Sequence, residues 1–159
     1  MNKILYSDKD LFTVVGNNTL ILSTVSLQPL KDPSYEVEKV KALYTPAYRD
    51  YVITTEDYRK KKILNNLLGR SYWFGYQDLK QRIAFIYVSK KNGKWHCPLI
   101  SITKRTVLGL DQLLTNLPPT IEVHCGKLNT NYTCLWPDTE KAINNLLQKF
   151  PKHRIIVHD

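Results

Sequence analysis

Residues 82–103 read RIAFIYVSKKNGKWHCPLISIT, and this stretch carries the strongest local structural signal in the chain. Apolar and polar residues alternate on both sides of Asn92-Gly93. Asn-Gly between two alternating segments favours a two-residue type I′ turn, because both turn positions need a positive φ. We therefore predict a β-hairpin made of residues 82–91 and 94–103. Its base is apolar on both faces, which indicates a central place in a sheet, although Pro98 disfavours a fully central second strand.

Strand and helix patterns alternate around this hairpin. The two strongest helices are predicted over residues 55–68 and 137–150, where apolar residues recur at helical spacing. Weaker patterns predict helices over 35–43 and 107–117, and strands over parts of 3–15, 19–27, 120–128, 132–136 and 154–157. The order predicts an α+β fold: one domain, residues 1–159, with a mixed or mainly antiparallel sheet containing the hairpin and two main helices packed on it.

The composition is typical of one globular domain, with 159 residues, 43% hydrophobic and 11% aromatic. The longest apolar run, residues 19–27, is far shorter than the roughly 18 residues that a membrane span needs, and the N-terminus lacks a signal-peptide core. We therefore expect no membrane partner and a cytoplasmic location, or a nuclear one in a eukaryotic or viral host. The oligomeric state stays open. Three cysteines without a signal peptide predict reduced thiols: Cys97, Cys125 and Cys134.

The positive charge is concentrated in the central third of the chain. The formal net charge is +9. Residues 58–105 hold twelve basic residues and a single acidic one, Asp78, for a charge of +11, whereas the remaining residues sum to −2. A surface selected only for solubility mixes both signs. Eight of the seventeen aromatic residues lie in the same segment.

Basic residues interleaved with aromatic residues are what a nucleic-acid groove needs, because cations follow phosphates and rings stack on bases. The first functional hypothesis is therefore a non-enzymatic nucleic-acid-binding protein, DNA and RNA being equally open. The predicted contacts are Arg59, Lys62, Asn66, Arg70, Tyr72, Trp73, Lys90, Lys91, Lys94, Trp95, Lys104 and Arg105.

Two alternatives belong to other classes. The same basic segment suits an interaction or inhibitor protein that docks on an acidic protein surface. A metal-dependent nuclease or related phosphodiesterase is the second alternative, since carboxylates and a lysine on adjoining strands can hold Mg²⁺ and activate water. Its weak candidate residues are Asp111, Glu122, His124 and Lys127.

No cofactor is predicted, apart from Mg²⁺ in the nuclease alternative. Gly-rich nucleotide-binding motifs and the nucleophile elbow are absent from the sequence. His96-Cys97 and His124-Cys125 could suggest zinc. Adjacent residues of a strand point to opposite faces, however, so such pairs do not readily supply two ligands to one ion. No metal site is therefore predicted. Whether the chain is an enzyme stays open: a non-enzymatic role is favoured, and an enzyme would be a nuclease or phosphodiesterase.

Overall fold

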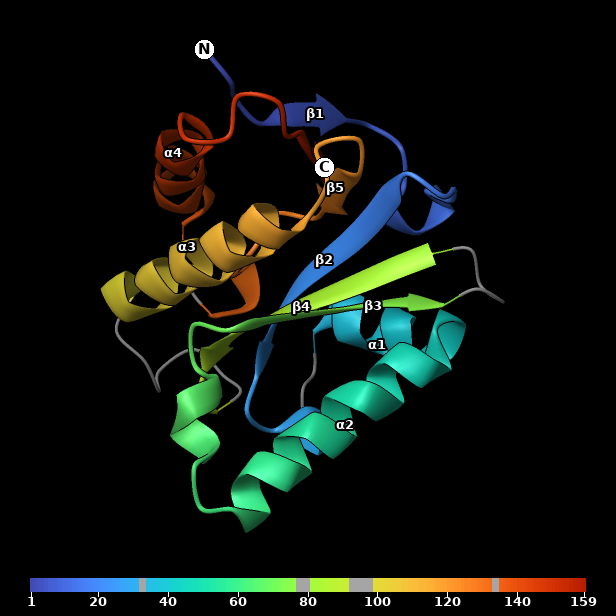
Figure 1. Cartoon of the computed structure of the whole chain (residues 1–159), viewed down its shortest axis with the longest axis vertical. Coiled ribbons are helices and arrows are strands. Elements are labelled where there is room, and N and C mark those ends of the chain that lie inside the picture. The colour runs from blue at the N-terminus through green and yellow to red at the C-terminus, as the bar shows by residue number, and fades with distance from the viewer. Residues whose placement is uncertain (32–33, 77–80, 92–98, 133–134) are drawn as a thin grey trace.

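A six-stranded mixed sheet organises the chain (Figure 1). The computed structural model describes residues 1–31, 34–76, 81–91, 99–132 and 135–159. The strand order is β1-β6-β5-β2-β4-β3. The strands span Leu5–Ser7 (β1), Thr19–Ser26 (β2), Ser71–Tyr76 (β3), Gln81–Ser89 (β4), Glu122–Cys125 (β5) and Ile155–His158 (β6).

The pairing is parallel everywhere except at one edge. β1 with β6, β6 with β5, β5 with β2, and β2 with β4 are all parallel, and only β3 runs antiparallel to its neighbour β4. Central strands buried on both faces have nearly continuous apolar sequences. β2 is buried in this way at seven of its eight residues, although its sequence TLILSTVS includes four hydroxyl side chains. The predicted mixed sheet with packed helices is confirmed, but the sheet is mainly parallel rather than mainly antiparallel.

Two helical layers cover opposite faces of the sheet. α1 (Tyr35–Leu43) and α2 (Thr45–Lys60) pack on the face that carries Ile21 and Phe85. α3 (Leu99–Asn116) and α4 (Trp136–Leu147) pack on the face that carries Leu20 and Ile86. Short 3₁₀ turns complete the connections: η1 (Leu11–Thr13), η2 (Pro29–Lys31), η3 (Leu64–Leu67) and η4 (Thr130–Tyr132).

The predicted Asn-Gly hairpin is wrong for its second strand. Residues 92–98, which include Asn92-Gly93, lie outside the described residues, and Leu99 begins α3 instead of continuing a strand. Ile102 belongs to the buried stripe of that helix, together with Leu110 and Leu113. The short apolar run around Ile102 fits both a strand and a buried helix, and length decides between them. The antiparallel partner of β4 is β3, which precedes it.

The predicted helix over residues 55–68 is also displaced. α2 begins at Thr45 with Pro46 in its first turn and ends at Lys60. Proline is favoured in a first turn, since its missing N–H would have no partner there. Lys62 has a φ of 60°, which ends the helical path, and residues Leu64–Leu67 form η3. Thr55 is therefore a buried interior residue of α2 and no helix cap.

Most of the remaining predicted elements have the observed kind but different bounds, and one is wrong. α1 spans residues 35–43 as predicted, while α3 starts eight residues before the predicted 107. The strand predicted over 132–136 is wrong, because Tyr132 ends η4 and α4 begins at Trp136. In the described part of the chain, no helix has the length and apolar character needed to cross a membrane.

A buried hydroxyl pair joins α2 to the sheet and allows a test of the fold. Thr55 Oγ1 donates to the Tyr51 carbonyl at 2.7 Å and lies 2.9 Å from Tyr87 Oη, so the Tyr87 hydroxyl donates to Thr55. Burial raises the pKa of Tyr87 above its ordinary value. We expect Thr55→Val to lower the free energy of unfolding by about 1–3 kcal/mol, because a buried donor loses its acceptor.

Chemical denaturation followed by circular dichroism measures this change. Thr55→Ser keeps the hydroxyl and serves as the control, with a smaller loss. Replacing both partners, as in Thr55→Val with Tyr87→Phe, removes the unsatisfied donor and should recover part of the stability. A double variant no more stable than Thr55→Val would contradict the role of this hydrogen bond.

Candidate functional site

After the neighbouring parallel strands β2 and β5, the chain turns to opposite faces of the sheet. Leu20 of β2 lies beside Val123 of β5. After β2 the chain continues into α1 on one face, and after β5 it continues into α4 on the other (Figure 1). In open α/β sheets, ligands bind in the crevice that such a reversal opens at the carboxyl ends of the strands. The sheet topology therefore places a candidate site at the ends of β2 and β5.

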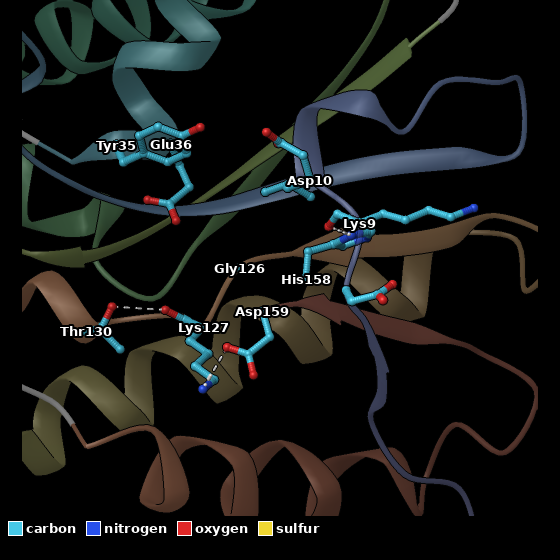
Figure 2. A pocket seen from close by; sticks show the side chains of 11 residues that line it. Lys9, Asp10, Tyr35, Glu36, Gly126, Lys127, Thr130, His158 and Asp159 are labelled. Carbon is cyan, nitrogen blue, oxygen red and sulfur yellow. Dashed lines mark hydrogen bonds and ion pairs between the residues drawn. The ribbon is translucent and has the colours of Figure 1, made fainter.

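A cavity of about 470 Å³ lies at this edge of the sheet. Its walls come from the segments that follow β1 and β5, from the start of α1 and from the end of β6 (Figure 2). Small-molecule sites are typically concave and of a few hundred Å³. The lining residues are Asp8, Lys9, Asp10, Leu11, Tyr35, Glu36, Gly126, Lys127, Thr130, His158 and Asp159.

Glu36 and Gly126 bring α1 and β5 together at the cavity. Ser34 Oγ accepts the Val37 N–H at 3.2 Å and so caps α1, which fixes Glu36 in its first turn. Gly126 follows β5 directly, and a Cβ added there would lie 2.9 Å from Glu36 Oε1. Figure 2 shows the Glu36 carboxylate reaching from α1 toward the segment that contains Gly126. The glycine leaves room for a carboxylate at the strand end.

Acidic residues outnumber basic residues in the lining. Lys127 Nζ pairs with Asp159 Oδ1 at 2.9 Å across one wall. Asp10 Oδ1 accepts the Phe12 N–H at 2.9 Å, which orders the segment after β1. Carboxylates accept hydrogen bonds from amino and hydroxyl groups but repel phosphates. The set consists of four carboxylates, Asp8, Asp10, Glu36 and Asp159, against two ammonium groups, Lys9 and Lys127.

Exposed lysines lie at the ends of the neighbouring strands. Lys90 and Lys91 directly follow β4, and Lys31 ends η2 after β2. Because β2 and β4 are parallel neighbours, their carboxyl ends lie at the same edge of the sheet as the cavity. This edge of the sheet therefore changes from mainly acidic cavity residues near β1 and β6 to exposed lysines near β4.

Two hydrogen-bonded histidines on the neighbouring strands β5 and β6 form a chain beside the cavity. His158 Nδ1 lies 2.9 Å from the Lys9 carbonyl, and His124 Nδ1 lies 2.8 Å from His158 Nε2. His124 Nε2 is 3.5 Å from Glu122 Oε1 and has no hydrogen-bond partner. Burial, and then the neighbouring His158, lower the pKa of His124, an effect that Glu122 partly opposes. Neutral His124 is therefore favoured at neutral pH.

The predicted basic contacts are spread over both faces of the sheet. Arg59, on α2, lies 3.7 Å from Glu56 and donates to the Leu27 carbonyl at 3.4 Å. Lys104 and Arg105 are on α3, which covers the opposite face, and Arg105 donates to the Val88 carbonyl at 3.0 Å. Several of these cations already have partners within the protein. Among the described residues, the predicted cations on α2 and on α3 lie on opposite faces of the sheet and so do not share one continuous surface for phosphates.

The other predicted contacts occupy varied positions. Lys62 is exposed shortly before η3, Asn66 is exposed within η3, and Arg70 donates to the Tyr58 hydroxyl at 3.4 Å. Tyr72 is half-buried with its ring edge-to-face on Tyr87, whereas Trp73 on edge strand β3 is 37% exposed. Of the predicted contacts that the structure describes, only Lys90 and Lys91 follow a strand at the edge where the cavity lies. Lys94 and Trp95 are outside the described residues.

The nuclease candidates do not assemble. Asp111 is on α3, which packs on the sheet face of Val123 and Cys125, while Glu122 and His124 point to the opposite face. Lys127 is paired with Asp159. Within the described ranges, no group of three or more His, Cys, Asp or Glu residues could hold a metal ion.

The predicted cysteine chemistry is tested at one position. Cys125 is a free, fully buried thiol, and burial raises its pKa to about 12. Such a thiol is not reactive at neutral pH. Cys97 and Cys134 lie outside the described residues, as does His96.

The same fold occurs in solved structures. The macrodomain of Mycobacterium tuberculosis DarG superimposes with a TM-score of 0.77 at 16% identity, over 99% of this chain and 98% of that one. A macrodomain protein from Streptomyces coelicolor gives 0.71 at 14% identity, over 99% of both chains. The fold is the macrodomain fold.

A third structure of this fold holds a ligand. Thermosipho africanus DarTG in complex with ADP-ribose matches with a TM-score of 0.71 at 14% identity, over 99% of this chain and 42% of that one. No protein-family model and no curated protein matches the sequence.

The macrodomain fold overturns the predicted function. The chain was expected to bind nucleic acid through its basic segment or, as alternatives, to act as a nuclease or to dock on an acidic protein. The structures that share its fold include macrodomains of DarG and of Streptomyces coelicolor, and a DarTG structure in complex with ADP-ribose. The error came from treating proximity in sequence as proximity in space, since α2, β4 and α3 carry the basic residues to different sides of the sheet.

Most of the cavity residues escaped the sequence-based search. The sequence predicted no role for four cavity residues: Asp8, Asp10, Glu36 and Asp159. It predicted Lys127 of the cavity, and the nearby His124, only as nuclease candidates. Their common signal is position: each of the first four follows a strand end or begins a helix at the same edge. These positions can be recognised as one site only when β1, β2, β5 and β6 are known to be parallel.

Proposed function

We propose that this protein binds ADP-ribose, free or attached to another molecule, in the crevice at the carboxyl ends of β1, β6, β5 and β2. The observation that carries the proposal is the coincidence of a macrodomain fold with a cavity of about 470 Å³ at its topological switch point. The complex of Thermosipho africanus DarTG with ADP-ribose supports the choice of ligand.

The charge distribution supports an orientation for the ligand. The acidic end of the crevice suits the nucleoside, because Asp10 and Glu36 can accept hydrogen bonds from an exocyclic amino group and ribose hydroxyls. Tyr35, which is 56% exposed at the rim, offers a ring face for stacking on a base. The nucleoside is therefore placed between the start of α1 and the end of β6.

The diphosphate is placed toward the basic end. Glu36 and Glu38 lie in the first turn of α1 and oppose the favourable dipole that a helix N-terminus offers to a phosphate. Lys90 and Lys91 at the end of β4 are exposed and carry the opposite charge. The diphosphate and second ribose therefore extend from the cavity toward β4.

Isothermal titration calorimetry with ADP-ribose, AMP and ribose 5-phosphate tests this proposal. ADP-ribose is expected to bind more tightly than either fragment, because it spans both ends of the crevice. In the variant Lys90→Glu/Lys91→Glu, each exposed charge is worth about 1 kcal/mol or less. Affinity for ADP-ribose should then fall roughly tenfold, while affinity for adenosine should stay unchanged.

The matched control is Lys60→Glu/Lys61→Glu, which makes the same charge change at the end of α2. It should leave ADP-ribose binding nearly unchanged. Absence of both heat and thermal stabilisation at millimolar ADP-ribose, in a protein whose circular dichroism shows it to be folded, would reject the proposed function.

A further inference from the structure

The Lys9 carbonyl fixes which atoms donate and which accept in the hydrogen-bonded chain formed by His158 and His124. The Lys9 carbonyl can only accept, so His158 Nδ1 carries the hydrogen and, in the neutral ring, His158 Nε2 accepts. His124 Nδ1 must then donate, which leaves His124 Nε2 without a hydrogen. In the neutral chain this atom is a buried acceptor that faces a second acceptor, the Glu122 carboxylate, at 3.5 Å.

One added proton completes the chain. A proton on His124 Nε2 would replace the lone pair that faces Glu122 Oε1 at 3.5 Å with a positive charge, which the carboxylate attracts. A second proton has no place, because it would set two N–H groups against each other between His124 and His158. The pair therefore holds at most one extra proton, and its titration belongs to both rings together.

The chain ends on the wall of the proposed ligand site. His158 lines both the strand-end cavity and a second cavity of about 410 Å³ that also contacts Glu122 and His124. The Lys9 carbonyl that His158 holds lies between Asp8 and Asp10, two carboxylates of the ligand cavity. A change at His124 thus reaches the cavity wall through two hydrogen bonds.

We propose that Glu122 and His124 are positioning residues: by taking up one proton with His158, they fix residues 8–10 and make ligand binding in the crevice depend on pH. The ligand part of this inference rests on the proposed function. The titration of the chain and its effect on residues 8–10 do not.

The surrounding charges set the direction of the effect. Glu122 faces His124 and is shared with Arg154 at 3.5 Å, and Lys9 borders the second cavity. On the ligand side, His158 lies among more acidic than basic residues of the cavity. The four carboxylates are Asp8, Asp10, Glu36 and Asp159, and the two ammonium groups are Lys9 and Lys127. An added proton reduces this negative charge, so binding of an anion such as ADP-ribose becomes more favourable as the pH falls.

Nuclear magnetic resonance of the ligand-free protein tests the chain itself. The ring signals of His124 and His158 and the backbone amides of residues 8–10 are followed between pH 8 and pH 5. We expect one common midpoint for the rings and the amides, and uptake of one proton by the pair. Amides that do not follow the rings would overturn the inference.

Two substitutions separate proton uptake from simple structural support. In Glu122→Gln the side-chain amide can donate to His124 Nε2 and satisfy it without a proton, so the common midpoint should move to lower pH. In His124→Asn the amide N–H replaces the donor to His158 but cannot titrate, so the amides of residues 8–10 should lose the shared transition. An unchanged amide titration in both variants would overturn the inference. His153→Asn is the control, because His153 is a buried histidine bonded to a different carbonyl, that of Leu117.

Calorimetry in two buffers of different ionisation enthalpy then counts the protons taken up with ADP-ribose. We expect a fraction of one proton in the wild type and none in Glu122→Gln, with affinity rising by at most about tenfold per pH unit on acidification. Binding without proton uptake in the wild type would reject the coupling. Complete absence of ADP-ribose binding, with the common titration intact, would instead reject the proposed function and leave the positioning chain established.

Discussion

Replacing Gly126 with leucine is expected to remove most of the ADP-ribose binding while leaving the protein folded. A Cβ at this position would already lie 2.9 Å from Glu36 Oε1, and a leucine side chain would extend into the cavity. Gly126 does not have a positive φ, so the backbone accepts a side chain without strain. The effect of the substitution is therefore steric and confined to the site.

Its size follows from the overlap with the ligand. Forcing extra methyl groups into an occupied space costs about 1–3 kcal/mol, which corresponds to a roughly 10- to 100-fold loss of affinity. Calorimetry with ADP-ribose measures the loss, and thermal denaturation confirms that the variant is folded. Asn66→Leu adds similar bulk at an exposed position within η3, which does not line the cavity, and should bind as the wild type does. Undiminished binding by Gly126→Leu would move the ligand site away from this cavity.

The second large effect is expected at Gly109, where α3 approaches the sheet. A Cβ on Gly109 would lie 2.4 Å from Ile86 Cγ2 and 3.1 Å from Ile86 Cγ1. Ile86 is fully buried in β4 and cannot move aside without disturbing the core. Glycine inside a helix is destabilising by about 1 kcal/mol relative to alanine, so its presence here marks a contact that tolerates no side chain.

Gly109→Val should lower the free energy of unfolding by about 3 kcal/mol, because overpacking at Ile86 exceeds the gain in helix propensity. For a chain of this size, the midpoint of thermal unfolding should fall by roughly 10 °C. Thr115→Val, on the exposed side of the same helix, should change stability by less than about 0.5 kcal/mol.

A double-mutant cycle identifies the cause. Ile86→Ala alone is destabilising by about 2–5 kcal/mol because it leaves a cavity. Combined with Gly109→Val it provides space for the new side chain, so the double variant should be at least about 1 kcal/mol more stable than the sum of the single effects. Strict additivity would show that the overlap with Ile86 is not what makes Gly109→Val destabilising.

Local patterns predicted elements whose stability is set within the segment. α1 was predicted from a weak pattern and has the predicted bounds, and the structure shows local support for it in the Ser34 cap and the buried Val37 and Val40. Prediction failed where tertiary contacts decided the outcome. Ile102 reads as part of an alternating strand in sequence, yet it is buried in α3 against the sheet.

The ligand cavity shows the same division. Asp8, Glu36, Gly126 and Asp159 are separated by up to 151 positions in the chain and meet only because parallel strands bring their carboxyl ends to one edge. The basic segment, residues 58–105, led to the opposite error: residues of one segment were expected to lie together but do not. Basic residues of this one segment, on α2 and α3, lie on opposite faces of the sheet.

The sequence by itself determined that the chain forms helices packed on a mixed sheet, because hydrophobic periodicity and capping residues act over a few neighbouring positions. It also determined how much charge the chain carries. Only the tertiary structure decided which strands are parallel, where the crevice opens, and that Glu122, His124 and His158 stand in one hydrogen-bonded line. These features depend on contacts between distant segments, and the free energy that selects them comes from burying the two faces of the sheet, to which the composition of any single segment contributes only a part.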